Sequence, residues 1–355
     1  MRIRTLPDVA PRTHLPLIDI APLISGDRPE RHDVAEAIDR ACRSLGFFRI
    51  TGHGLDPTLL TRLDQHSRVF FEQSNEIKAD VAMPNAGSAW RGWFPVGGEV
   101  TSGVPDRKEG LYVGLDHAFD HPLVVTGTPL HGTNLFPPGP LGPTVMEWIA
   151  ALIPIANAVM SGIALGLGLP EDWFETHITT DPTVLFRVFH YPALPDNDRS
   201  QEFGVGEHSD YGLLTLLAQD HHGGLQVRTP SDEWIDVPPE PDVLVCNLGD
   251  MLDKLTEGRY RSTPHRVRNL SGHSRLSFPF FFDPSWDAMV TPLPLDDSPP
   301  ADDAARRWDG TSLRAWSGTY GDYLSAKVAR VFPQLFEQVG NVPHGPAGAI
   351  TAAED

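Results

Sequence analysis

The chain has 355 residues, of which 40% are hydrophobic and 21% are charged. This composition is typical of a folded globular protein and excludes a chain that is disordered throughout. With 47 acidic and 28 basic residues, the formal net charge is −19. A surface this acidic repels phosphate backbones and anionic lipid, so we predict no nucleic-acid partner and no membrane partner.

The cysteines and the apolar segments indicate where the protein works. Cys42 and Cys246 are the two cysteines, far apart and in apolar surroundings, which is no disulfide framework. Residues 1–16 lack the apolar core of a signal peptide. Residues 148–169 are uncharged and long enough to span a bilayer, but Pro154 and several polar or small residues interrupt them. We therefore predict a buried helix there and a cytoplasmic protein.

The first part of the chain, residues 1–136, is predicted to be an α/β N-terminal domain. It opens with a strand-like LPLIDI at 15–20. Apolar residues at helical spacing follow over 34–45, and GFFRI at 46–50 predicts a second strand. Residues 137–182 are predicted to be a Pro/Gly-rich linker and a central helix.

The third part, residues 183–290, is predicted to contain many short strands separated by Gly, Pro, Asn and Asp turns. Strands at this spacing favour a sandwich or a jelly roll (double-stranded β-helix), in which a closed double sheet can hold a ligand between its faces. Residues 291–355 are predicted to form a loop and a C-terminal helix near 317–337 that packs on the core. The fold class is thus mainly β with flanking helices.

A metal site is predicted from EHSDYG at 207–212. In a strand, residues i and i+2 point to the same face, so His208 and Asp210 can bind one ion together. A third ligand is available at His265 in STPHRV. Two imidazoles and one carboxylate leave three coordination positions open, which suits iron(II) that must accept a bidentate cosubstrate and dioxygen.

An anion site is predicted from SRLSFPFFF at 274–282. Arg275 and Ser277 alternate on one face of a strand, and an inward guanidinium among apolar residues needs an acidic partner. A bound dicarboxylate is a natural partner, because arginine grips a carboxylate through two hydrogen bonds. The same alternation places Phe281 inward, as a wall of the substrate pocket.

These motifs together resemble the isopenicillin N synthase-like branch of the 2-oxoglutarate/iron(II) dioxygenases. HSD, STPHRV and RLS occur in the family's order. ACRSLGFFRITGHG, RGWFP, DRKEGLYVG, LHGTNLFP, HYP, CNLGDML and YLSAKVARVFP extend the resemblance over nearly the whole chain.

The resemblance implies that His208, Asp210 and His265 bind Fe(II), and that Arg275 and Ser277 bind the distal carboxylate of 2-oxoglutarate. It implies that Tyr191 contacts this cosubstrate and that Trp93 lines the substrate pocket. Phe189 stands where many plant members have an asparagine that precedes the tyrosine by two residues.

The implied reaction is oxidation, by default hydroxylation, of a small molecule such as a natural-product intermediate. Dioxygen and 2-oxoglutarate are consumed, and succinate and carbon dioxide are released. Desaturation, ring closure and epoxidation differ only in the fate of the substrate radical.

Two alternatives remain open at this point. Some family members with the same motifs are oxidases that do not consume 2-oxoglutarate, and there the arginine grips the substrate. A non-catalytic small-molecule-binding protein on the same fold is the other. These motifs indicate neither the oligomeric state nor the identity of the substrate.

Two further clusters receive structural interpretations. Asp106, Lys108 and Glu109 are interpreted as a local salt-bridge cluster. His117 and His121 have helical i,i+4 spacing, but the surrounding Asp and Pro residues predict a loop rather than a metal site.

Overall fold

The structure is a computed structural model that describes residues 14–101, 103–193, 203–296, 298–302, 307 and 312–332. A sheet of eight strands forms the main layer, in the order β1-β2-β12-β9-β14-β7-β6-β3. Its strands are β1 (Leu17–Asp19), β2 (Phe47–Thr51), β3 (Gly92–Phe94), β6 (Glu109–Gly114), β7 (Pro182–Tyr191), β9 (Leu214–Gln219), β12 (Leu244–Leu248) and β14 (Arg275–Ser285).

A sheet of four antiparallel strands, in the order β11-β10-β13-β8, forms the second layer. Its strands are β8 (Phe203–His208), β10 (Leu225–Arg228), β11 (Trp234–Val237) and β13 (His265–Arg268). Residues of both sheets line one cavity, so the two sheets enclose it as the predicted jelly roll requires. A separate two-stranded ribbon joins β4 (Val100–Thr101) to β5 (Val104–Pro105).

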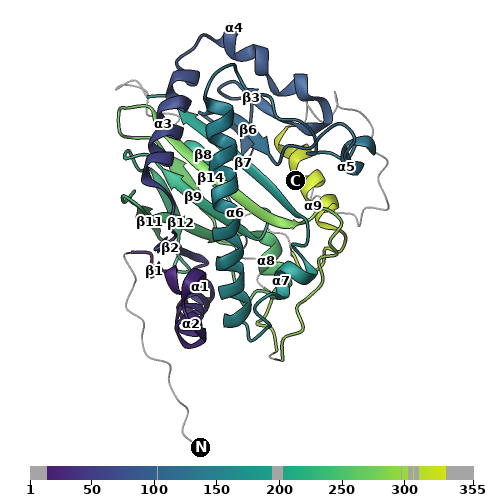
Figure 1. Ribbon diagram of the computed structural model, residues 1–355. Helices are drawn as coiled ribbons and strands as arrows, with labels where there is room; N and C mark the ends of the chain where they lie inside the picture. The colour runs from purple at the N-terminus through teal and green to yellow at the C-terminus, as the bar shows by residue number, and fades with distance from the viewer. Residues whose placement is uncertain are drawn as a thin grey trace, which may run out of the picture.

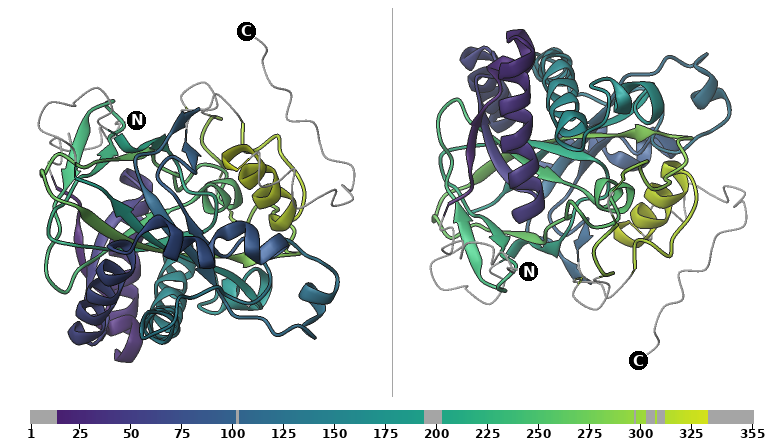
Figure 2. Two further views of the ribbon diagram at one scale, coloured as in Figure 1. Left: turned by 90° about the horizontal axis from the view of Figure 1, so that it is seen from above. Right: turned by 90° about the horizontal axis from the view of Figure 1, so that it is seen from below.

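Three helices cover one face of the eight-stranded sheet: α2 (Arg28–Ser44), α3 (Pro57–Phe71) and α6 (Leu141–Gly166). Figure 2 shows them grouped on one side of the molecule, with α9 (Tyr320–Val331) away from them. The shorter helices are α1 (Ala21–Ser25), α4 (Asn75–Lys78), η1 (Ala79–Val81), η2 (Met83–Ala89), α5 (Pro122–Val125), α7 (Trp173–His177) and α8 (Asp250–Leu255).

Helix α6 lies at the centre of this layer (Figure 1), as predicted from the uncharged stretch. By length and composition it is the one helix in the described part of the chain that could cross a membrane. Its residues Trp148, Ile149 and Leu152 are buried, and the helix packs against α2, α3, β9 and β14. The apolar run therefore packs against the large sheet as part of the protein core, which explains why charged residues are absent from it.

Helices α2 and α9 both begin at a clear N-terminal capping motif. In α2, the Asp27 side chain accepts a hydrogen bond from the Glu30 backbone, and the Glu30 side chain accepts one from the Asp27 backbone. Thr319 and Asp322 form the same capping box at the start of α9. Such a box satisfies backbone donors that the first helical turn leaves without partners.

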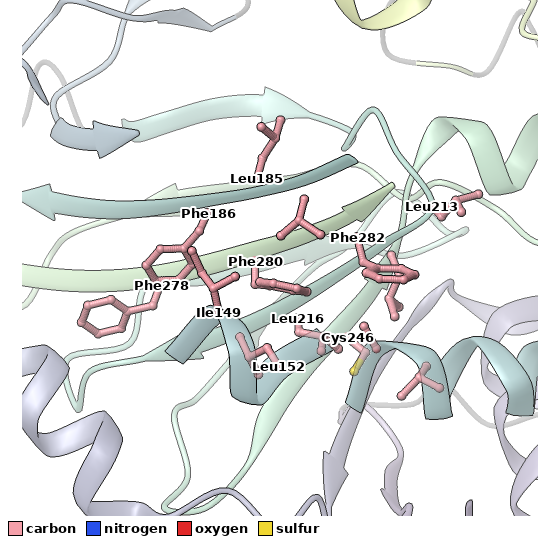
Figure 3. Close-up of a cluster of buried hydrophobic side chains, with 14 of the residues drawn as sticks. Ile149, Leu152, Leu185, Phe186, Leu213, Leu216, Cys246, Phe278, Phe280 and Phe282 are labelled. Atoms are coloured by element: carbon pink, nitrogen blue, oxygen red, sulfur yellow. The ribbon is translucent and has the colours of Figure 1, made fainter. Parts of the chain in front are cut away.

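Strand β14 separates the core from the cavity by simple alternation. Leu276, Phe278, Phe280 and Phe282 are fully buried on the helix side, and Figure 3 shows Phe278 and Phe280 beside Ile149 and Leu152 of α6. The intervening residues line the cavity between the sheets: Arg275, Ser277, Pro279, Phe281 and Asp283. The period-two pattern of a strand thus places chemistry on one face and packing on the other.

The strands from the N-terminal part complete the large sheet. β2 pairs antiparallel with β12, and β6 pairs antiparallel with β7. The predicted C-terminal helix near 317–337 is observed as α9, and residues 333–337 lie outside the described residues.

Candidate active site

The three predicted metal ligands lie together at one end of the four-stranded sheet. β8 ends at His208 and β13 begins at His265, and these residues face each other in the antiparallel pairing of the two strands. Asp210 lies beyond the end of β8, in the connection to β9, rather than within a strand as predicted. Its side chain nevertheless comes to the same point, because the connection crosses from one sheet to the other.

The geometry of these three residues fits a divalent metal. Their ligand atoms all lie within 4.8 Å of one another, the one such group found among the described residues. Asp210 Oδ1 is 3.9 Å from His208 Nε2 and 3.6 Å from His265 Nε2. Two imidazoles and one carboxylate on one side of a point are the donor set of non-haem iron(II) oxygenases.

Backbone carbonyls orient both imidazoles toward that point. His208 Nδ1 donates to Gly206 O at 2.8 Å, and His265 Nδ1 donates to Thr263 O at 3.2 Å. Burial, reinforced by the neighbouring His208, lowers the pKa of His265 to about 4. His265 is therefore neutral at physiological pH, and its Nε2 keeps a lone pair for a metal.

Two residues of the large sheet fix the carboxylate of Asp210. Thr215 Oγ1 and Asn247 Nδ2 both donate to Asp210 Oδ2, at 2.5 Å and 2.6 Å, which leaves Oδ1 turned toward the imidazoles. Burial raises the pKa of this carboxyl, but the two histidines and the two hydrogen bonds outweigh it and lower the pKa. Asp210 is thus held as a carboxylate, the form that binds metal.

The predicted anion site lies on the opposite wall of the same cavity. Arg275 is fully buried; its Nε donates to Gly223 O, and its Nη2 donates to Gln219 Oε1 at 2.9 Å. The buried Nη1 has no hydrogen-bond partner among the described residues. An unsatisfied buried guanidinium nitrogen is costly, and the carboxylate of a bound dicarboxylate would supply the missing acceptor.

Ser277 and Tyr191 lie beside Arg275. The hydroxyls of Ser277 and Tyr191 are 3.4 Å apart, and the Arg275 guanidinium carbon lies 4.8 Å from the centre of the Tyr191 ring. Arg275 and Ser277 lie on β14 and Tyr191 lies on the adjacent strand β7, where Arg275 and Tyr191 are partners in the β7–β14 pairing. The structure therefore brings all three predicted cosubstrate residues together.

The cavity between the sheets has a volume of about 130 Å³. His208, Asp210, His265, Arg275 and Ser277 line it, with Tyr191, Phe189 and Phe281. Trp93, which the resemblance placed in the substrate pocket, does not line it. It is buried in β3 at the edge of the large sheet, where its Nε1 donates to Glu109 Oε2 at 2.8 Å.

Several polar residues of the cavity escaped the sequence analysis. Arg187 shares the inward face of β7 with Tyr191, and Asp283 shares that of β14 with Arg275. The alternation that identified Phe281 would have found both, had it been extended along each strand. Asn247 is on β12, where the alternate residues Cys246 and Leu248 belong to the core.

The charged cluster around Lys108 differs from the prediction. Lys108 Nζ pairs with Asp106 and with Glu99 Oε2, the latter at 2.8 Å, and Lys108 and Glu99 line the cavity. Glu109 instead pairs with Lys78 at 2.7 Å, because Lys108 immediately precedes β6 and neighbouring residues of an extended segment point to opposite faces. The salt-bridge cluster is therefore two separate clusters.

Comparisons with known proteins agree with this site. Residues 182–284 match the model of the 2OG-Fe(II) oxygenase superfamily, and residues 15–139 match that of the non-haem dioxygenase N-terminal domain in morphine synthesis. A probable iron/ascorbate oxidoreductase of Dictyostelium discoideum is 42% identical, over 92% of this chain and 96% of the relative. The chain belongs to the 2OG-Fe(II) oxygenase superfamily.

Two further proteins are informative. A 1-aminocyclopropane-1-carboxylate oxidase of Dictyostelium mucoroides is 36% identical, over 90% of this chain and 95% of the relative. A full-length Neurospora crassa protein, crystallised in complex with alpha-KG (2-oxoglutarate) and thymine, has a TM-score of 0.74 at 26% identity. The similarity to this structure covers 91% of our chain and 98% of the Neurospora chain.

The chain is therefore an enzyme that oxidises a small-molecule substrate, in a family that uses Fe(II) and 2-oxoglutarate. The jelly-roll prediction is confirmed by the same similarity, and the hypothesis of a non-catalytic binding protein is not supported. When bound, the iron activates dioxygen for oxidation of a C–H bond, while the protein supplies orientation and a closed, shaped cavity.

Proposed function

We propose that the enzyme consumes 2-oxoglutarate and hydroxylates a small molecule that contains a carboxylate. The observation that supports the cosubstrate assignment is the buried Arg275, whose Nη1 lacks a partner among the described residues, opposite the His208–Asp210–His265 group. Arg275, Ser277 and Tyr191 hold the distal carboxylate of 2-oxoglutarate, and the three metal ligands hold Fe(II). Both assignments follow from the donor sets of these residues.

The substrate carboxylate is assigned to Arg187. Its guanidinium carbon lies 3.4 Å from the centre of the Tyr112 ring and 5.4 Å from that of Phe281, in the cavity. Its buried Nη1 has no hydrogen-bond partner among the described residues. The rings fix the guanidinium plane and leave Nη1 to a ligand, and the oxidase from Dictyostelium mucoroides is named for a substrate with a carboxylate.

Anaerobic reconstitution with Fe(II) tests the cosubstrate assignment. Addition of 2-oxoglutarate should produce a weak visible charge-transfer band, and His208→Ala and Arg275→Met should both abolish it. Arg187→Met is the matched control, because it removes a guanidinium from the same cavity and should leave the band intact. A wild-type protein that binds iron but gives no band would overturn the assignment.

A panel of small carboxylic acids and amino acids tests the substrate assignment. Succinate formation should depend on a carboxylate in the substrate, and Arg187→Met should raise the KM of the best substrate. Loss of a buried charge-paired contact costs about 2 kcal/mol or more, roughly a 30-fold change. An unchanged KM in this variant would contradict the role of Arg187.

A second candidate is an oxidase that does not consume 2-oxoglutarate, and the similarity to the oxidase of Dictyostelium mucoroides favours it. If this chain were such an oxidase, Arg275 would bind the substrate itself. Product oxidation without stoichiometric succinate would establish this alternative and reject ours.

We also propose a cytoplasmic location and the four-part division at residues 136, 182 and 290. The location is supported by Cys42 and Cys246, which are both free and buried. The division is supported by the two family models, which end and begin near the first two boundaries. With a net charge of −19, nucleic acid and membranes are not proposed as partners.

A further inference from the structure

A second cavity, of about 280 Å³, lies at the ends of β7 and β14, and among the described residues it shares no lining residue with the active cavity. Arg91, His117, His121 and His131 all line it. The sequence predicted a loop around His117 and His121, and the structure confirms this but adds His131 to the pair. The ring centre of His117 lies 4.5 Å from that of His121 and 5.1 Å from that of His131.

Arg91 supplies the positive charge of this cavity. It is 2% exposed, and its Nη2 donates to Leu130 O at 2.6 Å. Its Nε and Nη1 are buried without a hydrogen-bond partner among the described residues. The guanidinium lies flat against Gly114, where a Cβ atom would come within 2.2 Å of Nη2.

Two more buried polar atoms in the same wall lack partners among the described residues: His117 Nδ1 and Thr183 Oγ1. Burial lowers the pKa of Arg91 to about 9, so the group remains charged at neutral pH. Burial also lowers the pKa of His131 to about 4, so that imidazole is neutral. Isolated buried polar groups and charges are costly unless something bonds to them.

A metal ion does not fit these groups. The three imidazoles do not form a ligand group within 4.8 Å, since the described residues contain one such group, at His208, Asp210 and His265. The charge of Arg91 would also repel a cation. The acidic residues of the cavity, Asp181 and Asp287, are exposed, whereas Arg91 and His131 are buried.

Most of the remaining lining is apolar and includes Leu115, Leu123, Leu130 and Val184, and Ser285 is a further polar residue. Trp286 stands edge-on to His131, with ring centres 5.1 Å apart. An inorganic anion would leave this surface uncovered, whereas an organic acid would cover it and reach Arg91 at the same time. We propose that this cavity is a second binding site, separate from the active site, for a small organic carboxylate with an apolar body.

Isothermal titration calorimetry of the full chain with benzoate tests the proposal. The protein is held anaerobic with Fe(II) and saturating 2-oxoglutarate, and the Arg187→Met variant is titrated in parallel so that the active cavity offers no free guanidinium. Benzoate should bind the Arg187→Met protein at one site, and the uncharged match benzamide should bind it at least about tenfold more weakly, as expected for loss of a charge-assisted contact.

Arg91→Met should weaken benzoate binding by about tenfold or more for the same reason. Thr183→Val, which keeps the side-chain shape, is the second variant should Arg91→Met fail to fold. It should weaken benzoate binding while slightly raising the melting temperature of the ligand-free protein, because it removes an unsatisfied hydroxyl.

Three outcomes would overturn the proposal: no benzoate binding to the Arg187→Met protein, binding of benzoate by the Arg91→Met and Thr183→Val variants as tight as by the protein that keeps both residues, or tighter binding of inorganic phosphate than of benzoate. Because 2-oxoglutarate and Arg187 are controlled separately, none of these outcomes depends on the proposed reaction.

Discussion

The eleven residues of β14 alternate between two faces that have different roles. On the helix side, Phe278, Phe280 and Phe282 are fully buried against α6. On the cavity side, Arg275 and Asp283 are also buried but polar. Arg275 donates a hydrogen bond to Gly223 O, and Asp283 accepts one from the Tyr320 hydroxyl of α9. The difference shows that burial alone does not identify the core of this protein, because a wall of the active cavity is as inaccessible as the core itself.

The largest expected effect on stability comes from comparing neighbouring positions on the two faces of β14. Phe280→Ala should lower the free energy of unfolding by about 3–5 kcal/mol, because it leaves a void in the packed core. Phe281→Ala should cost clearly less, because its ring is half-buried and faces the cavity. Urea unfolding followed by circular dichroism compares them, and equal losses would break the distinction between the faces.

The second effect concerns the acid on the cavity face. Burial raises the pKa of Asp283 from 3.8 to about 7, while Tyr320 and the Leu213 backbone donate to its oxygens. Between these values the folded state binds more protons than the unfolded state, so stability should fall as the pH rises from about 4 to about 7. The size is on the order of a few kcal/mol.

Asp283→Asn cannot ionise and should remove this decline. Unfolding of the metal-free wild type and variant at about pH 4 and about pH 7.5 measures the difference. A variant with the same pH dependence as the wild type would show that another group causes the decline.

The third effect tests the support of the metal site from the large sheet. Asn247→Ala removes the hydrogen bond to Asp210 Oδ2 and should weaken Fe(II) binding by about 10–100-fold. Asn134→Ala is the matched control, since Asn134 is also a buried amide but bonds to the Gly114 backbone. Equilibrium dialysis with Fe(II) under anaerobic conditions should show weaker binding only for the first variant.

The smallest effect concerns a residue that belongs to neither face. Trp93→Phe removes a hydrogen bond to Glu109 and should cost about 1 kcal/mol of stability. The KM values for 2-oxoglutarate and substrate should not change, because Trp93 does not line the cavity. A raised substrate KM would instead indicate that Trp93 contributes to the substrate pocket.

Much of the jelly roll was predictable because it obeys period-two patterning over short segments. The predicted strands RLSFPFFF, TVLFRVFHY and DVLVCNL are close to β14, β7 and β12. The inward direction of Arg275, Ser277 and Phe281 followed from the same rule. Asp210 was the exception: it was expected within a strand, but the strand ends at His208 and a connection between sheets places the carboxylate.

The sequence by itself determined the strands, the central helix and the three spaced motifs, because each is encoded within a few neighbouring residues. Only the tertiary structure decided which distant side chains meet. It placed Asn247 and Thr215 on Asp210, paired Lys108 with Glu99 rather than with Glu109, and moved Trp93 away from the cavity. It also gathered Arg91 and three histidines around a second cavity. Such contacts depend on strand order and on connections between sheets, which no local pattern of residues specifies.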